Sequence, residues 1–329
     1  MKTIRFWLKN ARSIALPQSV MPAVLAVCMA SRWEGFSVIT GLMAVVGVIA
    51  GHLGINLLDD YFDYKVKKTD YRMQMEHKGM RARISKCTYL TSGEATMKQL
   101  WIACCIFSTV ALVIGVVVFL FRGPFILFMA LMTGLLGFFY SGPPFRLSYR
   151  GFGEILIGLM FGPMLMTGVF FAACGVFDPS VLFVSIPVGL LVTNIVYSHA
   201  IMDYEPDKAV GKMTLAGLIK NRTWMLVFLA LILLLSFGLI VSGVVSKYLS
   251  PYYLASFLTL PLAINLFYLM IQFVRHPERS YSPRFWMGPM NNWEKIQAVG
   301  IDWFMIRWLS ARNLLGFFCI LLMVVSLVE

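Results

Sequence analysis

Charged residues are scarce in this sequence. Asp, Glu, Lys and Arg make up 13% of its 329 residues, whereas they make up about 25% of an ordinary soluble domain. Hydrophobic residues reach 59% and gather in long runs. This composition argues against a soluble globular domain. The runs predict an all-α, polytopic membrane protein, because about 20 consecutive apolar residues cross the hydrocarbon core of a bilayer.

Paired cysteines are missing as well. None of the six cysteines forms a C-x-x-C pair, and five of them lie inside apolar runs. A zinc site or a disulfide framework is therefore not expected, and the cysteines are interpreted as small buried apolar residues. The net charge is +12, but no nucleic-acid-binding motif accompanies it. Nucleic acid is not an expected partner.

Nine apolar segments are present, and each is predicted to be a membrane helix. Residues 1–329 are expected to form a single membrane domain, in which the helices surround a central cavity open to the cytoplasmic side. The segments cover 12–30, 36–58, 96–121, 124–140, 152–174, 180–202, 223–246, 251–274 and 311–328.

Positive charge is confined to one side of this predicted topology. All but three of the 28 Lys and Arg residues fall on the side of the N-terminus, the exceptions being Arg32, Arg122 and Lys247. The positive-inside rule makes that side cytoplasmic, so the protein is predicted to be integral to the cytoplasmic membrane. The same surplus would attract anionic membrane lipid.

Three connections on the cytoplasmic side are long, and they are predicted to form loop or cap segments. They span 64–95, 203–222 and 275–310. Long connections in a compact protein are usually functional or disordered. The third is rich in tryptophan, and we expect it to contain an amphipathic helix around 293–309 that rests on the membrane surface.

The second predicted helix ends in NLLDDYFDYKVKKTD (56–70). Asp59 and Asp60 lie four and three residues before Asp63, so a helix places all three on one face. Like charges on one face repel unless a cation lies between them, and carboxylates at membrane depth usually have a function. Asn56, one turn earlier, offers a neutral oxygen. These four residues are candidate metal ligands.

A second acidic cluster, HAIMDYEPDKAVGKMTL (199–215), follows the sixth predicted helix. Asp203 and Asp207 are again four residues apart, and the topology puts both clusters on the same side of the membrane. The two clusters are expected to face each other across one cavity. Such carboxylates suit Mg2+, which proteins usually hold through a few carboxylates together with substrate phosphate oxygens. A diphosphate, neutralised in part by Lys and Arg, is the expected ligand.

Other interpretations of the first cluster fit less well. A calcium-binding EF-hand needs a glycine in mid-loop and a glutamate at the twelfth position, and residues 59–70 have neither. A cation transporter would place carboxylates near the middle of the bilayer rather than at helix ends. A solvated helix end explains one acidic cluster, but it does not explain two on the same side.

Several stretches resemble the UbiA superfamily of intramembrane aromatic prenyltransferases. DDYFD and DYEPD resemble its two aspartate motifs, and LPQSVMPAVLA resembles its opening helix. YSGPPFRLSYRGFGE (140–154) and DKAVGKMTLA (207–216) resemble the branch that acts on 1,4-dihydroxy-2-naphthoate. The resemblance covers about residues 10–270, and the segment 275–310 matches nothing known to us.

This resemblance implies a fold and a reaction. A polyprenyl diphosphate would lose its Mg2+-bound diphosphate, and the allylic cation would alkylate an aromatic quinone precursor, as in menaquinone biosynthesis. Asp60 and Asp63 would form the first catalytic metal cluster and Asp203 and Asp207 the second. Lys212 would help to hold the diphosphate. The sequence departs from the family at Asp59, where Asn is usual, and at His199 and Ala200, where the naphthoate branch has two Asn residues.

Further residues are candidates because they lie near the expected cavity mouth. Lys67, Arg72 and Arg146 are predicted to contact the diphosphate, although basic residues there also serve as topology anchors. The predicted pocket for the acceptor and the prenyl chain contains Tyr140, Tyr149, Arg150, Asn194 and His199. His52, in the middle of the second helix, is interpreted as a structural residue.

Alternative functions remain open from the sequence. A prenyltransferase with another acceptor and a membrane terpene cyclase would use the same aspartates. A family member without catalytic activity, or a carrier of cations or lipid diphosphates, is less favoured.

Overall fold

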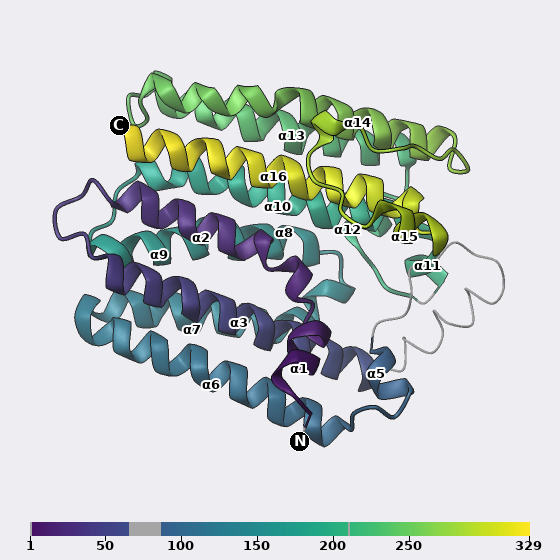
Figure 1. Cartoon of the computed structure of the whole chain (residues 1–329), viewed down its shortest axis with the longest axis horizontal. Helices are drawn as coiled ribbons and strands as arrows, with labels where there is room; N and C mark the ends of the chain where they lie inside the picture. Colours follow the sequence, from purple (N-terminus) through teal and green to yellow (C-terminus); the bar gives the residue numbers. More distant parts are fainter. Residues whose placement is uncertain (1, 66–86, 210) are drawn as a thin grey trace.

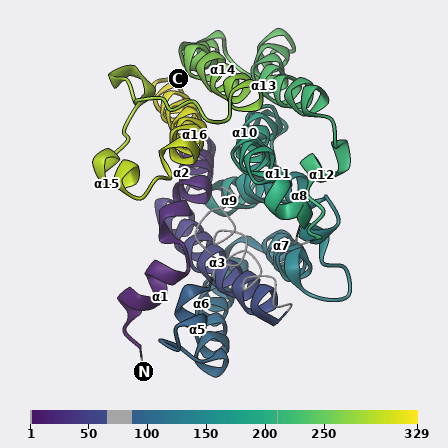
Figure 2. The ribbon, with the colours of Figure 1, turned by 90° about the vertical axis from the view of Figure 1, so that its right-hand side faces the viewer.

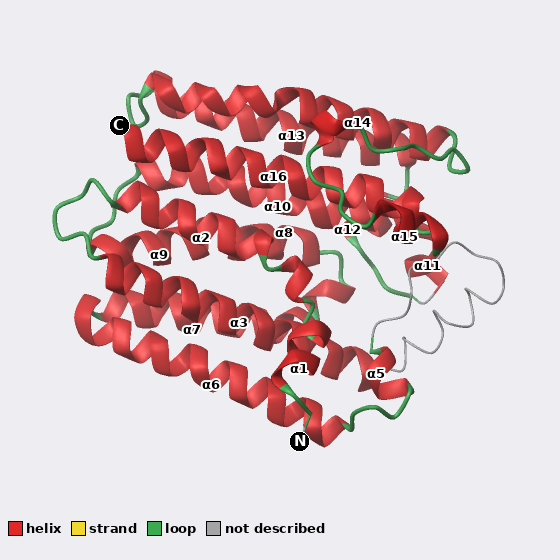
Figure 3. Cartoon of the chain, viewed as in Figure 1, coloured by secondary structure: helices red, strands yellow, loops and turns green. Residues whose placement is uncertain are grey.

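The fold is a bundle of roughly parallel and antiparallel helices in a computed structural model that describes residues 2–65, 87–209 and 211–329 (Figure 1). Helices dominate the described chain (Figure 3), and the one β-type pairing there is an isolated bridge between Arg150 and Met213. The all-α prediction is confirmed.

Eight helices of the described chain are long and apolar enough to cross a membrane. Two of them are each built from two or more consecutive labelled helices. The first three spans are α3 (Val38–Lys65), α6 (Met97–Arg122) and α7 (Pro124–Ser141).

The fourth span is interrupted: it consists of α8 (Gly153–Leu159), the π-helical turn η3 (Met160–Met164) and α9 (Leu165–Cys174). The four later spans are α10 (Ser180–Met202), α13 (Arg222–Val245), η4 with α14 (Pro251–Thr259 and Leu260–Arg275) and α16 (Asp302–Val328). The first predicted span corresponds to α2 (Pro17–Ala30), which has only 14 residues. Nine membrane-crossing helices therefore stay a prediction, because 14 residues are short for the hydrocarbon core.

Short helices gather at one end of the bundle. They are α1 (Ile4–Asn10), η1 (Ser13–Ala15), α5 (Thr88–Thr91), η2 (Leu147–Tyr149), α11 (Tyr204–Ala209), α12 (Leu215–Ile219), η5 (Phe285–Met287) and α15 (Trp293–Ala298). Figure 2 views the bundle from this end. The C-terminus lies at the opposite end, where Glu329 forms an ion pair with Arg32 at 2.5 Å.

Local sequence signals set the helix ends. Thr96 caps α6 by accepting a hydrogen bond from the Gln99 backbone N–H, and the Gln99 side chain accepts one from the Thr96 N–H. Pro17 and Pro124 occupy the first turns of α2 and α7, where a missing N–H costs nothing. Asn221 caps α13.

The membrane-spanning helices differ in the share of their residues that is buried within the protein. In its most apolar stretch, α10 has 72% of its residues buried within the protein, whereas α6 has 11%. A helix that is apolar all round and packed on every side belongs at the centre of the bundle. Helix α10 is therefore the central element, and the second acidic cluster begins at the residue that follows it, Asp203.

The segment 275–310 differs from the expected single interfacial helix. Helix α15 has six residues, and α16 already begins at Asp302 rather than near 311. Trp303, Phe304 and Arg307 are buried in the bundle, so the aromatic residues that suggested a surface helix instead pack as the first turns of α16. The prediction of one helix over 293–309 is wrong.

Candidate active site

The first acidic cluster occupies the last two turns of α3. Asp59, Asp60 and Asp63 are all buried, with exposed fractions of 7%, 3% and 9%. Three buried carboxylates on one helix face need compensating positive charge or hydrogen-bond donors. The neighbouring elements provide both.

Arg12 supplies the positive charge. One terminal nitrogen of its guanidinium lies 3.0 Å from Asp59 Oδ2 and 3.3 Å from Asp60 Oδ1, and it donates to the Asn56 carbonyl oxygen at 2.7 Å. Burial acts to lower the pKa of Arg12, but the charges of Asp60 and Asp59 outweigh it and raise the pKa above its ordinary value. Arg12 therefore remains a cation between the two carboxylates.

Hydroxyl groups supply the hydrogen-bond donors. Tyr89 of α5 donates to Asp60 Oδ2 at 3.1 Å, Ser141 at the end of α7 donates to Asp59, and Tyr149 of η2 donates to Asp63. Burial and the charge of Asp60 raise the pKa of Tyr89, so its hydroxyl stays protonated at neutral pH. Each carboxylate is thus held by a different element of the fold.

The second acidic cluster lies where α10 ends. Asp203 is the C-terminal cap of α10, and its Oδ2 lies 3.0 Å from His199 Nε2. Asp207 follows in α11, and its backbone carbonyl accepts a hydrogen bond from the Lys212 N–H at 2.9 Å. Both aspartates are buried, at 2% and 3% exposure. The Lys212 ammonium lies 5.9 Å from the centre of the Tyr149 ring, and so the loop after α11 approaches the residues around the first cluster.

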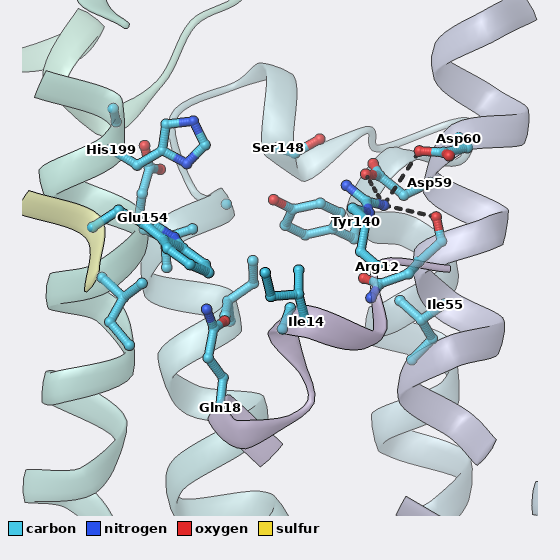
Figure 4. A pocket seen from close by; sticks show the side chains of 18 of the residues that line it. Arg12, Ile14, Gln18, Ile55, Asp59, Asp60, Tyr140, Ser148, Glu154 and His199 are labelled. Carbon is cyan, nitrogen blue, oxygen red and sulfur yellow. Dashed lines mark hydrogen bonds and ion pairs between the residues drawn. The ribbon is translucent and has the colours of Figure 1, made fainter. Parts of the chain in front are cut away.

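A cavity of about 530 Å³ joins the two clusters. Its lining includes Asp59 and Asp60 from α3 and Asp203 and Asp207 from the end of α10 and α11. Figure 4 shows Arg12 with Asp59 and Asp60 on one wall, His199 and Glu154 on the opposite wall, and the Tyr140 ring between them. The expectation that both clusters face one cavity is confirmed.

Some of the other predicted site residues line this cavity, and others do not. Its lining contains Asn56, Tyr140, His199 and Lys212. Asp63, Arg146, Tyr149, Arg150 and Asn194 are not part of it. Tyr149 still contacts the first cluster through Asp63, whereas Asn194 is fully buried within the bundle. Lys67 and Arg72 lie outside the described residues.

Asn56 has a structural contact that the sequence did not indicate. Its side-chain nitrogen donates to the Ala11 carbonyl at 2.9 Å. Together with the contact of Arg12 to the Asn56 carbonyl, this bond fastens the segment before α2 to α3. A role of Asn56 as a metal ligand stays a prediction.

Sequence reasoning missed several cavity residues. Arg12, Gln18 and Glu154 were not singled out as site residues, although all three line the cavity. Glu154 is buried and accepts a hydrogen bond from the Leu215 N–H at 3.1 Å. His52, interpreted as structural, also lines the cavity. A polar residue inside an apolar run was the available signal for Gln18 and His52.

The two clusters suit a divalent cation whose coordination a phosphate ligand completes. Among the described residues, no group of three or more His, Cys, Asp or Glu side chains is arranged to hold a metal ion by itself. The donors are nevertheless hard carboxylate oxygens on facing walls, which fits Mg2+ bound through a few carboxylates and completed by phosphate oxygens and water.

Comparison with known proteins decides the family. Residues 19–293 match the UbiA prenyltransferase family. The chain belongs to this family. It is a prenyltransferase and an integral membrane protein, as the sequence motifs suggested.

Relatives and solved structures agree with this assignment. The chain is 24% identical to a 1,4-dihydroxy-2-naphthoate octaprenyltransferase of Bacillus subtilis over 74% of this chain and 76% of the relative. It is 26% identical to a 2-carboxy-1,4-naphthoquinone phytyltransferase of Synechocystis over 64% of each chain. A UbiA homologue from Archaeoglobus fulgidus, solved bound to GPP and Mg2+, has a TM-score of 0.62 and 14% identity, covering 98% of this chain and 99% of that one. The likeness to that structure establishes the fold.

Proposed function

We propose that this prenyltransferase moves a polyprenyl group from a polyprenyl diphosphate to an aromatic quinone precursor, with 1,4-dihydroxy-2-naphthoate as the acceptor. The observation that carries the proposal is the pair of buried acidic clusters on facing walls of one cavity. The names of the naphthoate-directed relatives support the choice of acceptor.

Mg2+ is the proposed metal, and its proposed ligands are Asp60 and Asp63 of the first cluster and Asp203 and Asp207 of the second. Asp59 and Asn56 are additional candidate ligands beside the first pair. When bound, the metal would neutralise charge on the diphosphate leaving group. The Archaeoglobus homologue was solved with GPP and Mg2+, which supports divalent metal in this family.

The residues of the chain would bind and polarise the substrate. Lys212 and Arg12 both line the cavity, and their positive charges would neutralise part of the diphosphate charge. The allylic C–O bond breaks with its electron pair leaving on the diphosphate, and the Tyr140 ring offers a π-face to the resulting carbocation. Apolar residues of the lining, such as Ile157 and Met160, would help to keep water from capturing that cation.

The carbon–carbon bond then forms on the acceptor. The ring carbon that bears the carboxylate attacks the allylic carbon, and the carboxylate leaves as CO2, returning its bonding electrons to the ring. The step needs no external oxidant or base. We further propose that the cavity mouth and the N-terminus face the cytoplasm, because the basic residues concentrate at that end.

Substitution of single aspartates tests the proposal. Asp60→Asn and Asp203→Asn keep the side-chain shape but remove a charge, and each should lower prenyl transfer about 100-fold, equivalent to about 2.7 kcal/mol. The measurement is mass spectrometry of lipid products from purified protein given a polyprenyl diphosphate, Mg2+ and a panel of aromatic acids. Wild-type rates in either variant would refute the metal assignment.

Glu205→Gln is the matched control. Glu205 lies between Asp203 and Asp207, but its side chain is exposed and pairs with Arg222 at 3.1 Å on the surface. Such surface pairs contribute little free energy. The control should retain activity within about twofold. Product formed without any aromatic acid would point instead to a terpene cyclase.

A further inference from the structure

Two polar side chains lie in the cavity away from the carboxylates. His52 is on α3, two helical turns before Asp60, which places it about 12 Å further along the helix axis. Gln18 is in the first turn of α2. Both line the cavity, and both are more than nine-tenths buried. Figure 4 shows the Gln18 side chain extending toward the cavity.

A neighbouring serine binds one ring nitrogen of His52. Ser19 Oγ lies 2.6 Å from His52 Nδ1 and 3.2 Å from the Leu16 carbonyl oxygen. A hydroxyl has one proton, so Ser19 donates either to Leu16 or to Nδ1, and the tautomer of the imidazole follows from that choice. In both tautomers Nε2 is the ring nitrogen left for an occupant of the cavity, as an acceptor when Nδ1 carries the proton and as a donor when Nε2 carries it.

Both groups are within reach of an occupant of the cavity. In the described part of the chain, the His52 ring bonds Ser19 through Nδ1, and both His52 and Gln18 line the cavity. An imidazole nitrogen and an amide bind polar substituents by hydrogen bonds. An occupant with such a substituent therefore suits this part of the cavity better than a prenyl chain, which has none.

The surroundings also suit a flat ring. The Phe161 ring lies beside the His52 imidazole, with 4.7 Å between ring centres and an interplanar angle of 41°. Ile157, Met160 and Ile195 complete an apolar wall. Aromatic rings pack well against such faces.

We propose that His52 and Gln18 form a subsite for a ring hydroxyl of the aromatic acceptor. This inference rests on the proposed function and adds the residues that select the acceptor. In 1,4-dihydroxy-2-naphthoate, the 1-hydroxyl can bond to the adjacent carboxylate, so the 4-hydroxyl is the one free to form a hydrogen bond with His52 Nε2. Ser19 is a positioning residue, because it acts through the imidazole.

The test compares two acceptors that differ by that hydroxyl. Binding of 1,4-dihydroxy-2-naphthoate and of 1-hydroxy-2-naphthoate is measured by calorimetry under anaerobic conditions, with purified protein in nanodiscs and no prenyl diphosphate. Wild-type protein should bind the dihydroxy acid at least about tenfold more tightly than the monohydroxy acid. A site that forms a hydrogen bond with a hydroxyl binds a ligand without that hydroxyl more weakly. His52→Leu and Gln18→Leu should reduce this ratio to within about twofold.

A second set of variants separates recognition from folding. Ser19→Ala retains the imidazole but frees its orientation, so the ratio should fall partway, and Ser19→Thr should restore it. Ser236→Ala removes a buried hydroxyl on α13, remote from the cavity lining, and should leave the ratio unchanged. The steady-state KM for prenyl diphosphate should change by less than about twofold in the His52 and Gln18 variants.

Two results would overturn the inference. One is an unchanged binding ratio in folded His52→Leu and Gln18→Leu proteins. The other is a rise in the KM for prenyl diphosphate without a change in the ratio, which would put the prenyl chain at this subsite. A wild-type protein that prenylates neither acid but is active on another acceptor would instead refute the proposed acceptor.

Discussion

At the scale of single residues, Arg12 has the most unusual position. It lies in the left-handed backbone region, with φ of 59°, just before η1. From there one guanidinium nitrogen contacts Asp59, Asp60 and the Asn56 carbonyl. The N-terminal segment is thereby fastened to the acidic cluster by charge, and Arg12 offsets part of the negative charge of the cluster.

Replacement of Arg12 tests this compensation. Arg12→Met should destabilise the protein by about 2 kcal/mol, less than a fully buried ion pair would cost, because a third of the Arg12 side chain is exposed. Arg12→Lys should lose less, since it keeps the charge. The measurement is the thermal unfolding midpoint in detergent, with Arg5→Met on exposed α1 as the control.

Added Mg2+ makes the same experiment more specific. A divalent cation at the carboxylates would replace the missing positive charge, so Mg2+ should raise the midpoint of Arg12→Met more than that of wild type. An equal response of both proteins would mean that Arg12 and the metal do not share these carboxylates.

At the scale of elements, the crossing of the fourth span with α10 shapes the cavity wall. Glycines allow the two backbones to approach closely. A Cβ on Gly162 would lie 2.5 Å from the Ser185 carbonyl oxygen, and one on Gly189 would lie 2.5 Å from that of Gly158. The π-helical turn η3 at this crossing carries Met160 and Phe161, which line the cavity.

Gly162→Ala should therefore force the helices apart. We expect a cost of about 1–3 kcal/mol from overpacking, seen as a lower unfolding midpoint, together with weaker acceptor binding because Phe161 moves. Gly238→Ala on α13 is the control, since no atom lies within 4 Å of the added methyl group. If both variants unfold at the wild-type temperature, the close crossing does not limit stability.

The sequence predicted these elements better than it predicted their partners. Long apolar runs and the spacing of Asp59, Asp60 and Asp63 are local signals, so the spans and the acidic helix ends could be found directly. The pairing of Arg12 with α3 depends on contacts between segments more than 40 residues apart, and no local pattern encodes it. The start of α16 was misplaced because tryptophans at a membrane surface and tryptophans in a helix core look alike in sequence.

At the scale of the whole molecule, the acidic clusters belong to different parts of the bundle. Figure 1 shows α3, α6 and α7 in its lower part and α10, α13, α14 and α16 in its upper part. The first cluster lies in the last two turns of α3, and the second begins at the C-terminal cap of α10. A ligand that contacts both clusters would link the two parts and stabilise the folded protein through its binding energy.

This linkage predicts a joint effect of metal and diphosphate on stability. Mg2+ together with farnesyl thiodiphosphate, a slowly reacting analogue, should raise the unfolding midpoint more than the sum of their separate effects. At 100 times the Kd, the stabilisation is about 2.7 kcal/mol. Asp60→Asn and Asp203→Asn should each abolish most of the joint effect, and Glu205→Gln should retain it.

The double variant gives the sharper result. If one bridged ligand uses both clusters, Asp60→Asn combined with Asp203→Asn should lose little more than either single variant, because removing one side already breaks the bridge. If the clusters bind independently, each single variant should lose part of the effect and the losses should add. Additive losses would therefore contradict a single diphosphate site spanning the two parts of the bundle.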